Sequence, residues 1–436
     1  MRNNFTQLAL GALLSLGVSA ASAATFRIEI DYMGDGGGHN HLPDQLVLDA
    51  VIQMFACQGH TLIIDLDDEI PHYNTLTGDP NDDCGSFWTY TGANNTYRSI
   101  RNIYRDQGVG WHYCIFAHQY RVDSNDIDDN SGCVTSGSSG RANGGDAFIV
   151  TLGGFGGSTG TLFEQAATLA HEFGHNLGLG HAGSMDSGIT TPYVQNLPSV
   201  MAYTYQLSGV RSRLLNLAFA PEYALFKDID FSHGRMCSLN ENALDEPRGT
   251  RMLSVDFNCD DSPVSTGIAQ DLGFRGGGSG SAAPWCGELD DSRTTLVDYD
   301  EWGNLNDGAT LVANAERGEG ESSAELAKRE RLLDKQPCLD AETHFLMQAE
   351  NDRGGGGPDL VIESCITGEN CYVANSANAA PDGRCVDWYP AIAPAHNAMP
   401  QGSVFYLTPG TFDAVGTTTL NRRGIWTCNT GTARIQ

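Results

Sequence analysis

The sequence predicts an α+β fold followed by a second, smaller unit, and three observations support this. Short runs of alternating apolar and polar residues, such as Phe26 to Tyr32, are typical of half-buried strands. Stretches with helical apolar spacing lie between them, and a prominent one follows Thr161. The 436 residues exceed one domain of ordinary size, and the final part carries cysteines among short strand-like runs such as Val404 to Leu407.

The first residues predict a secretory signal peptide rather than part of the fold. Arg2 precedes an apolar run from Leu8 to Val18, which is followed by the small residues Ala21, Ser22 and Ala23. We therefore expect residues 1–23 to be removed and the mature chain to be secreted, into the medium or the periplasm. No later apolar run is long enough to span a bilayer, so we expect no membrane partner.

Cysteine content and charge restrict the remaining classes. The twelve cysteines predict up to six disulfides in an exported chain, with a buried thiol as the alternative for any one of them. Asp and Glu number 54 against 25 Lys and Arg, for a formal net charge of −29. This balance argues against nucleic acid and anionic membrane surfaces as partners.

The elements before Thr161 are expected to alternate between strands and helices. The predicted segments are a strand at Phe26 to Tyr32, a helix at Pro43 to Cys57 that Gly59 ends, strands at Thr61 to Asp65, Trp111 to His118 and Asp146 to Leu152, and a glycine-rich link from Gly153 to Gly160. The loop from Gly34 to His41 contains two histidines, His39 and His41. They are candidate metal ligands, although two loop histidines without a metal are the more ordinary interpretation.

Acidic residues gather at four places that could bind calcium. Two are interpreted as flexible loops, one from Asp65 to Asp83 and one from Asp123 to Asp129. A third, Asp256 to Asp260, partly resembles the start of a calcium-binding loop, and the fourth spans Asp298 to Glu301. Oxygen ligands on flexible loops suit Ca²⁺. Solvated acidic loops without an ion are the alternative at each place, so Ca²⁺ stays a candidate structural cofactor.

The pattern with the strongest chemical meaning is H-E-x-x-H-x-x-G-x-x-H, from His171 to His181. Thr161 and Glu164 predict a capping box at the start of its helix. On that helix His171 and His175 project from the same face, one turn apart. Gly178 allows the chain to leave the helix and turn back, so that His181 becomes a third ligand. Three imidazole ligands with an open fourth position are typical of a catalytic Zn²⁺ site.

This motif resembles the zinc signature of the metzincin clan of metalloendopeptidases. That clan also has a methionine turn, and the segment from Leu197 to Tyr203 is similar to it, with Met201 twenty residues (201 − 181) after His181. The resemblance implies a zincin-like domain with a mixed sheet and an active-site helix. It also implies that Met201 forms an apolar floor beneath the zinc, and that Tyr203 approaches the metal or the reacting carbonyl.

The resemblance further implies a secreted zinc endopeptidase that hydrolyses peptide bonds of protein or peptide substrates. A zinc-bound water would attack the scissile carbonyl, with Glu172 as the general base. In this clan an antiparallel edge strand borders the substrate, and here it should lie between Tyr120 and Gly145. Ala182 and Gly183 replace the acidic residue that astacin-like and reprolysin-like chains place after the third histidine. The safer assignment is therefore a bacterial, pappalysin-like or unclassified metzincin, not an astacin, reprolysin or serralysin.

The expected organisation is a signal peptide at 1–23, a protease domain at 24–305, and a linker with a small disulfide-stapled β-rich module at 306–436. A short charged helix is expected at Ser323 to Gln336, after a polar linker from Asn304 to Ser323. A monomer is expected. The alternatives are a secreted binding or adhesion protein on a zincin scaffold, and a zinc hydrolase that acts on other bonds.

Overall fold

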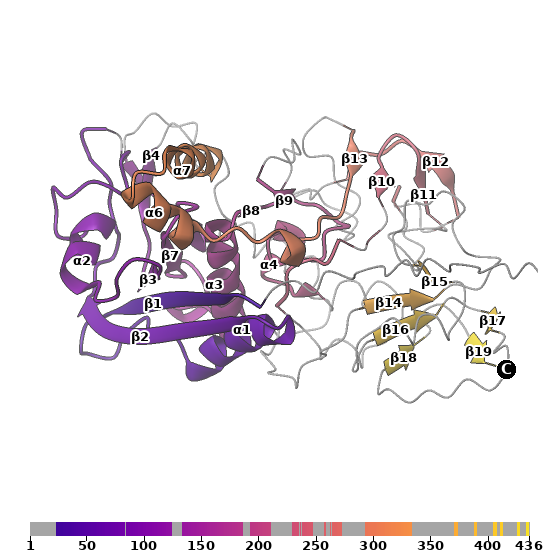
Figure 1. Cartoon of the computed structure of the whole chain (residues 1–436), viewed down its shortest axis with the longest axis horizontal. Helices are drawn as coiled ribbons and strands as arrows, with labels where there is room; N and C mark the ends of the chain where they lie inside the picture. The colour runs from indigo at the N-terminus through magenta and orange to yellow at the C-terminus, as the bar shows by residue number, and fades with distance from the viewer. Residues whose placement is uncertain are drawn as a thin grey trace, which may run out of the picture.

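The computed structural model describes residues 23–82, 84–123, 133–185, 192–210, 229–234, 236, 238–246, 257–258, 262, 264–272 and 293–333, together with the backbone of six short strands beyond residue 369 (Figure 1). The predicted signal peptide therefore lies outside the described residues, except for its last one. So does most of the loop from Asp256 to Asp260. Within the described part, no helix is long and apolar enough to cross a membrane.

A five-stranded mixed sheet forms the centre of the N-terminal body, in the order β2-β1-β3-β7-β6. Its strands are β1 (Thr25–Gly34), β2 (Thr61–Pro71), β3 (His112–Ala117), β6 (Gly140–Ala142) and β7 (Ala147–Thr151). The first four strands in the sheet order are parallel, and β6 pairs with β7 in the antiparallel direction. The predicted antiparallel strand between Tyr120 and Gly145 is therefore present, and it is β6 at the sheet edge.

Alternation along the central strands divides the core into two faces. On β3, Cys114 and Phe116 point into the larger core, which also contains the buried residues of helices α1 (Gln45–Cys57) and α3 (Leu162–Asn176). Tyr113 and Ile115 point into the other core, beneath helix α2 (Tyr97–Tyr104). Helices thus cover both faces, which explains why β3 and β7 are buried along their whole length.

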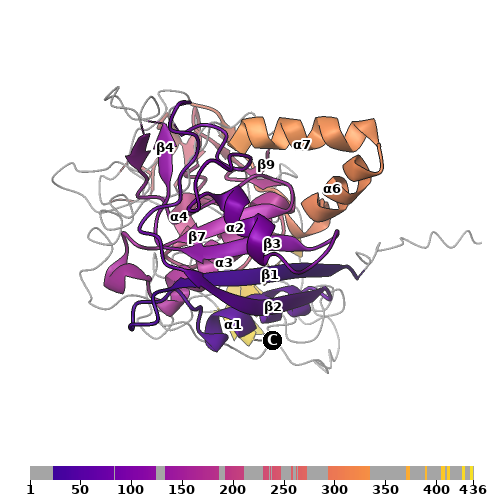
Figure 2. The same cartoon turned by 90° about the vertical axis from the view of Figure 1, so that its left-hand side faces the viewer.

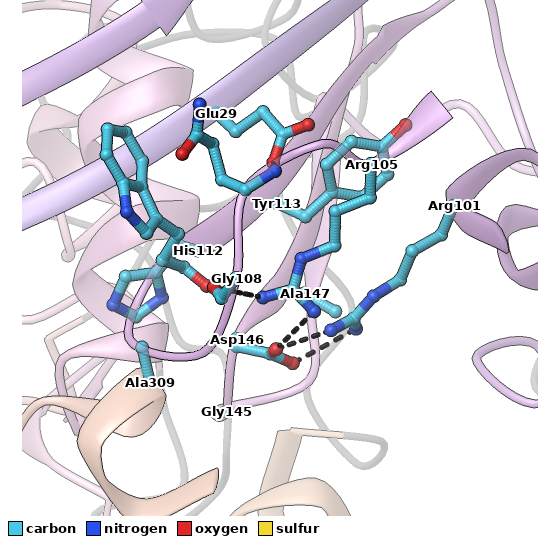
Figure 3. A network of polar contacts seen from close by, with 12 residues as sticks. Glu29, Arg101, Arg105, Gly108, His112, Tyr113, Gly145, Asp146, Ala147 and Ala309 are labelled. Carbon is cyan, nitrogen blue, oxygen red and sulfur yellow. Dashed lines mark hydrogen bonds and ion pairs between the residues drawn. The ribbon is translucent and has the colours of Figure 1, made fainter. Parts of the chain in front are cut away.

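A buried ion-pair network fixes α2 to the sheet (Figure 3). Arg101 donates from both terminal nitrogens to the two carboxylate oxygens of Asp146, the first at 3.0 Å, and Arg105 lies 3.2 Å from the same carboxylate. Arg105 also donates to the carbonyl of Gly108 at 3.2 Å. Burial alone would raise the pKa of Asp146, but the charge and hydrogen bonds of Arg101 outweigh it and hold that pKa below its ordinary value.

The remaining described elements are short. They are the antiparallel pairs β4 (Arg121–Asp123) with β5 (Cys133–Thr135), β8 (Leu179–Gly180) with β9 (Gly183–Ser184), β10 (Leu239–Asn240) with β13 (Thr295–Leu296), and β11 (Leu244–Asp245) with β12 (Thr266–Ile268). The short helices are η2 (Gly156–Ser158), α4 (Tyr203–Gln206) and η4 (Trp302–Asn304). Beyond residue 369 the backbone forms β14 (Asn370–Val373), β15 (Trp388–Tyr389), β16 (Val404–Leu407), β17 (Gly410–Phe412), β18 (Ile425–Thr427) and β19 (Ala433–Ile435).

The stretch predicted as a linker contains helices. Helix α6 (Gly308–Glu316) begins at Asp307, whose carboxylate accepts from the Ala309 N–H at 3.0 Å and lies 2.8 Å from His112 Nε2. The linker prediction is therefore wrong, because buried Ala309 and Ala313 anchor α6. The charged helix that follows is present as α7 (Gly320–Leu333), and Figure 2 shows α6 and α7 beside the sheet.

Arg329 shows why α7 stays against the N-terminal body. Its side chain is 2% exposed and donates to the carbonyls of Gly144 and Asn306 at 3.1 and 3.0 Å. A guanidinium has enough donors to satisfy several carbonyls at once. The helices after residue 305 therefore pack onto the predicted protease domain. The boundary at residue 305 stays a prediction.

Two expectations about surface chemistry need correction. The acidic residues from Asp65 to Glu69 lie on β2, not on a flexible loop, so their carboxylates alternate between two faces of an edge strand.

The twelve cysteines do not all pair. Cys84 and Cys133 form a disulfide, but Cys114 is a buried thiol, so at most five disulfides can form from the other eleven cysteines. The cysteine side chains of the C-terminal module lie outside the described residues.

Candidate metal centre

Helix α3 carries the first two histidines of the motif in a fixed position. The predicted capping box is present: Thr161 Oγ1 accepts from the Glu164 N–H at 3.2 Å, and the Glu164 carboxylate accepts from the Thr161 N–H at 2.6 Å. All but one of the helix residues are buried, because the helix packs between the sheet and the segment that follows it. The helix therefore holds its side chains with little freedom.

The chain turns back directly after this helix and returns the third histidine. Leu177 caps α3, and Gly178 has φ +88°, a conformation that favours glycine. The two-residue strands β8 and β9 then form a small hairpin, with His181 at its turn. Gly183, which closes the hairpin, also has positive φ, at +90°. The chain therefore reverses direction just after Gly178.

Three imidazole nitrogens converge. His175 Nε2 lies 3.1 Å from His171 Nε2 and 3.1 Å from His181 Nε2, and all three side chains are buried. His171 Nδ1 lies 2.8 Å from the Val200 carbonyl, and His175 Nδ1 lies 2.8 Å from the Leu179 carbonyl. A carbonyl only accepts, so Nδ1 carries the proton and Nε2 presents a lone pair to the centre of the cluster.

Electrostatics favours the neutral, ligand-competent form of these rings. Burial is the main cause that lowers the pKa of His175 to about 4, and burial followed by the charge of His175 lowers that of His171 well below its ordinary value. Neutral imidazoles packed around one point offer their lone pairs to a cation. The donor set therefore fits a transition-metal ion such as zinc.

The methionine turn lies directly beneath α3. A Cβ on Gly174 would lie 2.4 Å from Met201 Sδ, so the sulfur occupies the space that any larger residue would need. The turn is held by its own hydrogen bonds: Ser199 Oγ accepts from the Met201 N–H at 3.0 Å, and the Val200 N–H donates to the Asp230 carbonyl at 2.9 Å. Val200 also accepts from His171, so this turn orients one of the three histidines.

Tyr203 and Glu172 border the same cluster. The Tyr203 ring centroid lies 4.5 Å from that of His181 and 6.2 Å from that of His171. Glu172 is buried, and a Cβ on Gly140 would lie 2.6 Å from both Cγ and Oε1 of Glu172. The Glu172 carboxyl group therefore lies against the edge strand β6. A side chain at Gly140 would displace it.

Of the predicted site residues, the structure brings together His171, His175, His181 and Tyr203. Glu172 lies against Gly140, Met201 lies against Gly174 of α3, and Gly178 lies in the turn after α3. The sequence analysis did not identify the two carbonyl acceptors, Val200 and Leu179, because every residue has a carbonyl and no side-chain signal marks these two.

The sequence analysis also missed His72 and His118. Among the described residues, two groups could hold a metal ion: the three histidines above, and a second set formed by His39, His41, His72 and His118.

Comparison with protein families gives one match, to a model described as Peptidase M66, over residues 123–206. The matched segment is 84 residues long (206 − 123 + 1) and contains β6, β7, α3, the histidine cluster and the methionine turn. This similarity supports a peptidase of a metallopeptidase family, which would act on protein or peptide substrates. The searches of curated proteins and of solved structures gave no match.

Proposed function

We propose that this chain is a secreted, zinc-dependent endopeptidase of the metzincin type. The observation that carries the proposal is the convergence of three buried Nε2 atoms, on His171, His175 and His181, next to a helix position that holds the buried Glu172. Two of the rings are oriented by carbonyl acceptors, as metal-binding histidines commonly are. The match to a peptidase family over the same residues supports the choice of reaction.

In this proposal His171, His175 and His181 hold the zinc ion. When bound, the zinc supplies Lewis acidity, which lowers the pKa of a water molecule and polarises the scissile carbonyl. Glu172 takes the proton from the attacking water and later gives it to the leaving amine, so it acts as base and then as acid. Tyr203, beside His181, is in position to donate a hydrogen bond to the oxyanion that develops.

Strand β6 explains how a peptide would be aligned with these groups. It is the edge of the sheet, so one side of its backbone pairs with β7 while the other is not paired within the sheet. An extended peptide can add to such an edge through main-chain hydrogen bonds. Gly140 lies against Glu172, so a peptide on β6 would pass beside the general base. We therefore propose that β6 binds the substrate.

The proposal is tested by Glu172→Gln, which removes the base but preserves the shape of the side chain. We expect kcat/KM on a quenched fluorescent protein substrate to fall by about 10²- to 10⁴-fold, the usual contribution of a general base. Zinc content by elemental mass spectrometry should stay at the wild-type value. Glu316→Gln, at an exposed glutamate that ends α6, controls for the lost charge and should retain full activity.

Other outcomes would contradict the proposal. Full activity in Glu172→Gln would remove Glu172 from the reaction. Bound zinc without cleavage of any protein by the wild-type chain would favour a binding or adhesion protein on this scaffold. Cleavage of small esters or amides with no activity on proteins would favour a hydrolase of another class.

A further inference from the structure

Four histidines meet at the carboxyl ends of three neighbouring parallel strands, away from the motif of α3. His39 and His41 lie in the loop that follows β1, His72 directly follows β2, and His118 directly follows β3. One ring nitrogen from each lies within 4.8 Å of the others. The carboxyl ends of adjacent parallel strands share one edge of the sheet, which explains how residues 79 positions apart come together (118 − 39).

Three of the six separations between these nitrogens match the edge of a tetrahedron around one ion, and all six are within 4.8 Å. His39 Nε2 lies 3.3 Å from His118 Nδ1, His118 Nδ1 lies 3.2 Å from His41 Nε2, and His41 Nε2 lies 3.4 Å from His72 Nε2. With zinc–nitrogen bonds of about 2.0–2.1 Å, the corners of a tetrahedron lie about 3.3–3.4 Å apart. A square-planar ion with similar bonds would place neighbouring nitrogens about 2.8 Å apart. The observed values therefore favour tetrahedral coordination.

Hydrogen bonding among the rings does not account for this arrangement. Each imidazole nitrogen has either one proton or one lone pair, so it makes one good hydrogen bond. His118 Nδ1 is close to both His39 and His41, and His41 Nε2 is close to both His118 and His72. At most two of these three contacts can be hydrogen bonds at the same time. A cation at the centre would use all four lone pairs.

The four rings are shielded from solvent to different degrees. His41 is buried, at 5% exposed, and the other three are partly buried. The carboxylate of Asp35 interacts with His39 and His72, so it would partly offset the charge of a bound ion.

Backbone hydrogen bonds hold the four ligands in place. The N–H of His41 donates to the Met33 carbonyl at 2.7 Å, and the N–H of His72 donates to the Gly34 carbonyl at 3.0 Å. The His118 carbonyl accepts from the Gly153 N–H at 2.8 Å. A Cβ on Gly153 would lie 2.8 Å from the His118 ring, so glycine leaves room for that ring. The positions of the ligands are therefore set by the sheet and its loops.

We propose that His39, His41, His72 and His118 bind a second zinc ion in tetrahedral geometry. Four protein ligands close the coordination sphere, which is typical of a structural zinc site and leaves no position for a substrate. The ion would tie the ends of β1, β2 and β3 together and stabilise the exposed loop of residues 35–40. This site shares no residue with the proposed catalytic centre and does not depend on the proposed function.

The test measures the number of zinc ions per chain in the wild-type full-length protein and in three variants of it. In the double variant His39→Ala/His72→Ala, zinc should fall from two ions per chain to one. The matched control Asn40→Ala lies between two ligands in the same loop and should keep both ions. In His175→Ala the four-histidine site should keep its ion. This variant separates the two sites, because a chain that has lost the catalytic ion should contain only the ion bound by the four histidines.

Spectroscopy and stability give readouts that do not depend on proteolysis. Co²⁺ in place of zinc should give the intense visible absorption of a tetrahedral ion in His175→Ala, and this absorption should be lost when His39→Ala/His72→Ala is added. The melting temperature of Asn40→Ala should fall on chelation as it does in wild type, whereas the double variant should show a smaller fall. Circular dichroism verifies that each variant is folded, and His39→Gln/His72→Gln replaces the alanine pair if it is not.

The proposal is overturned if folded His175→Ala protein, exposed to excess zinc, binds no ion. It is also overturned if the double variant keeps as many ions as Asn40→Ala. Tight binding of Cu²⁺ with a square-planar spectrum, and no retention of zinc, would overturn the assignment of the metal and its geometry.

Discussion

Gly174→Ala tests whether Met201 contacts helix α3, which carries His171 and His175, as the structure shows. The new methyl group would lie 2.4 Å from Met201 Sδ and 3.1 Å from two ring carbons of Phe231. Favourable carbon contacts lie at about 3.5–4.0 Å, so the sulfur and the helix must move apart. Forcing an extra methyl into a packed core costs about 1–3 kcal/mol.

The expected change in stability combines two opposing effects. Alanine is favoured over glycine within a helix by about 1 kcal/mol. The net effect of Gly174→Ala should therefore be a loss of up to about 2 kcal/mol, together with weaker zinc binding because His175 is the next residue. Urea unfolding followed by tryptophan fluorescence measures the first effect, and zinc retention during dialysis measures the second.

Two controls, Gly320→Ala and a Met201→Ala background, make this test specific. Gly320→Ala, at the first residue of α7, adds a methyl group with no atom within 4 Å and should leave the urea midpoint unchanged or slightly raised. In a Met201→Ala background the sulfur is absent, so adding Gly174→Ala should cost less than it does in wild type. Equal costs of Gly174→Ala in the wild-type and Met201→Ala backgrounds would refute the contact between Met201 and α3.

Three other predictions follow from the fold. Arg101 lowers the pKa of Asp146 in the folded protein below its value in the unfolded chain. The ionised carboxylate therefore stabilises the fold above the unfolded-chain pKa, and this stabilisation is lost as the pH falls through the folded-state pKa. Asp146→Asn should therefore lower the urea midpoint at pH 7 and reduce its acid sensitivity below about pH 4. Cys84→Ser/Cys133→Ser opens a loop with a sequence separation of 49 and should cost about 4 kcal/mol by urea unfolding. Arg329→Ala leaves the buried Gly144 carbonyl without this donor, and also removes the part-buried bond to the Asn306 carbonyl. It should cost about 1–3 kcal/mol by urea unfolding, whereas an unchanged midpoint would contradict the packing of α7.

The fold was predictable where the local pattern and the tertiary environment agree. The alternation of Phe26 to Tyr32 and the capping box at Thr161 led to β1 and α3. The strand predicted at Thr61 to Asp65 is the first half of β2. Its continuation was missed because Asp67, Asp68 and Glu69 resemble a loop in sequence, although an edge strand tolerates charged residues on its solvated face. Helix α2 was missed because only two of its eight residues are buried, which gives a short apolar signal.

The candidate site was predictable to the extent that its residues are close in sequence. His171, His175 and His181 follow a spacing that one helix and one turn convert directly into proximity. His72 and His118 have no such relation to His39 and His41, because their proximity depends on the order of strands in the sheet. The acceptors Val200 and Leu179 act through their backbones, so side-chain identity does not indicate their role.

The contact between α7 and the turn after α3 limits how far the chain can be shortened before the candidate metal centre loses its support. A Cβ on Gly178 would lie 3.1 Å from the Arg329 guanidinium, so a helix near residue 330 supports the reversal that delivers His181. A fragment that ends at residue 305 would lose this support and the pairing of Asp307 with His112. Proteolysis between α3 and α7 would thus disrupt the candidate metal centre without cleaving at any of its ligands. The shortest fragment expected to keep this centre intact ends after Leu333.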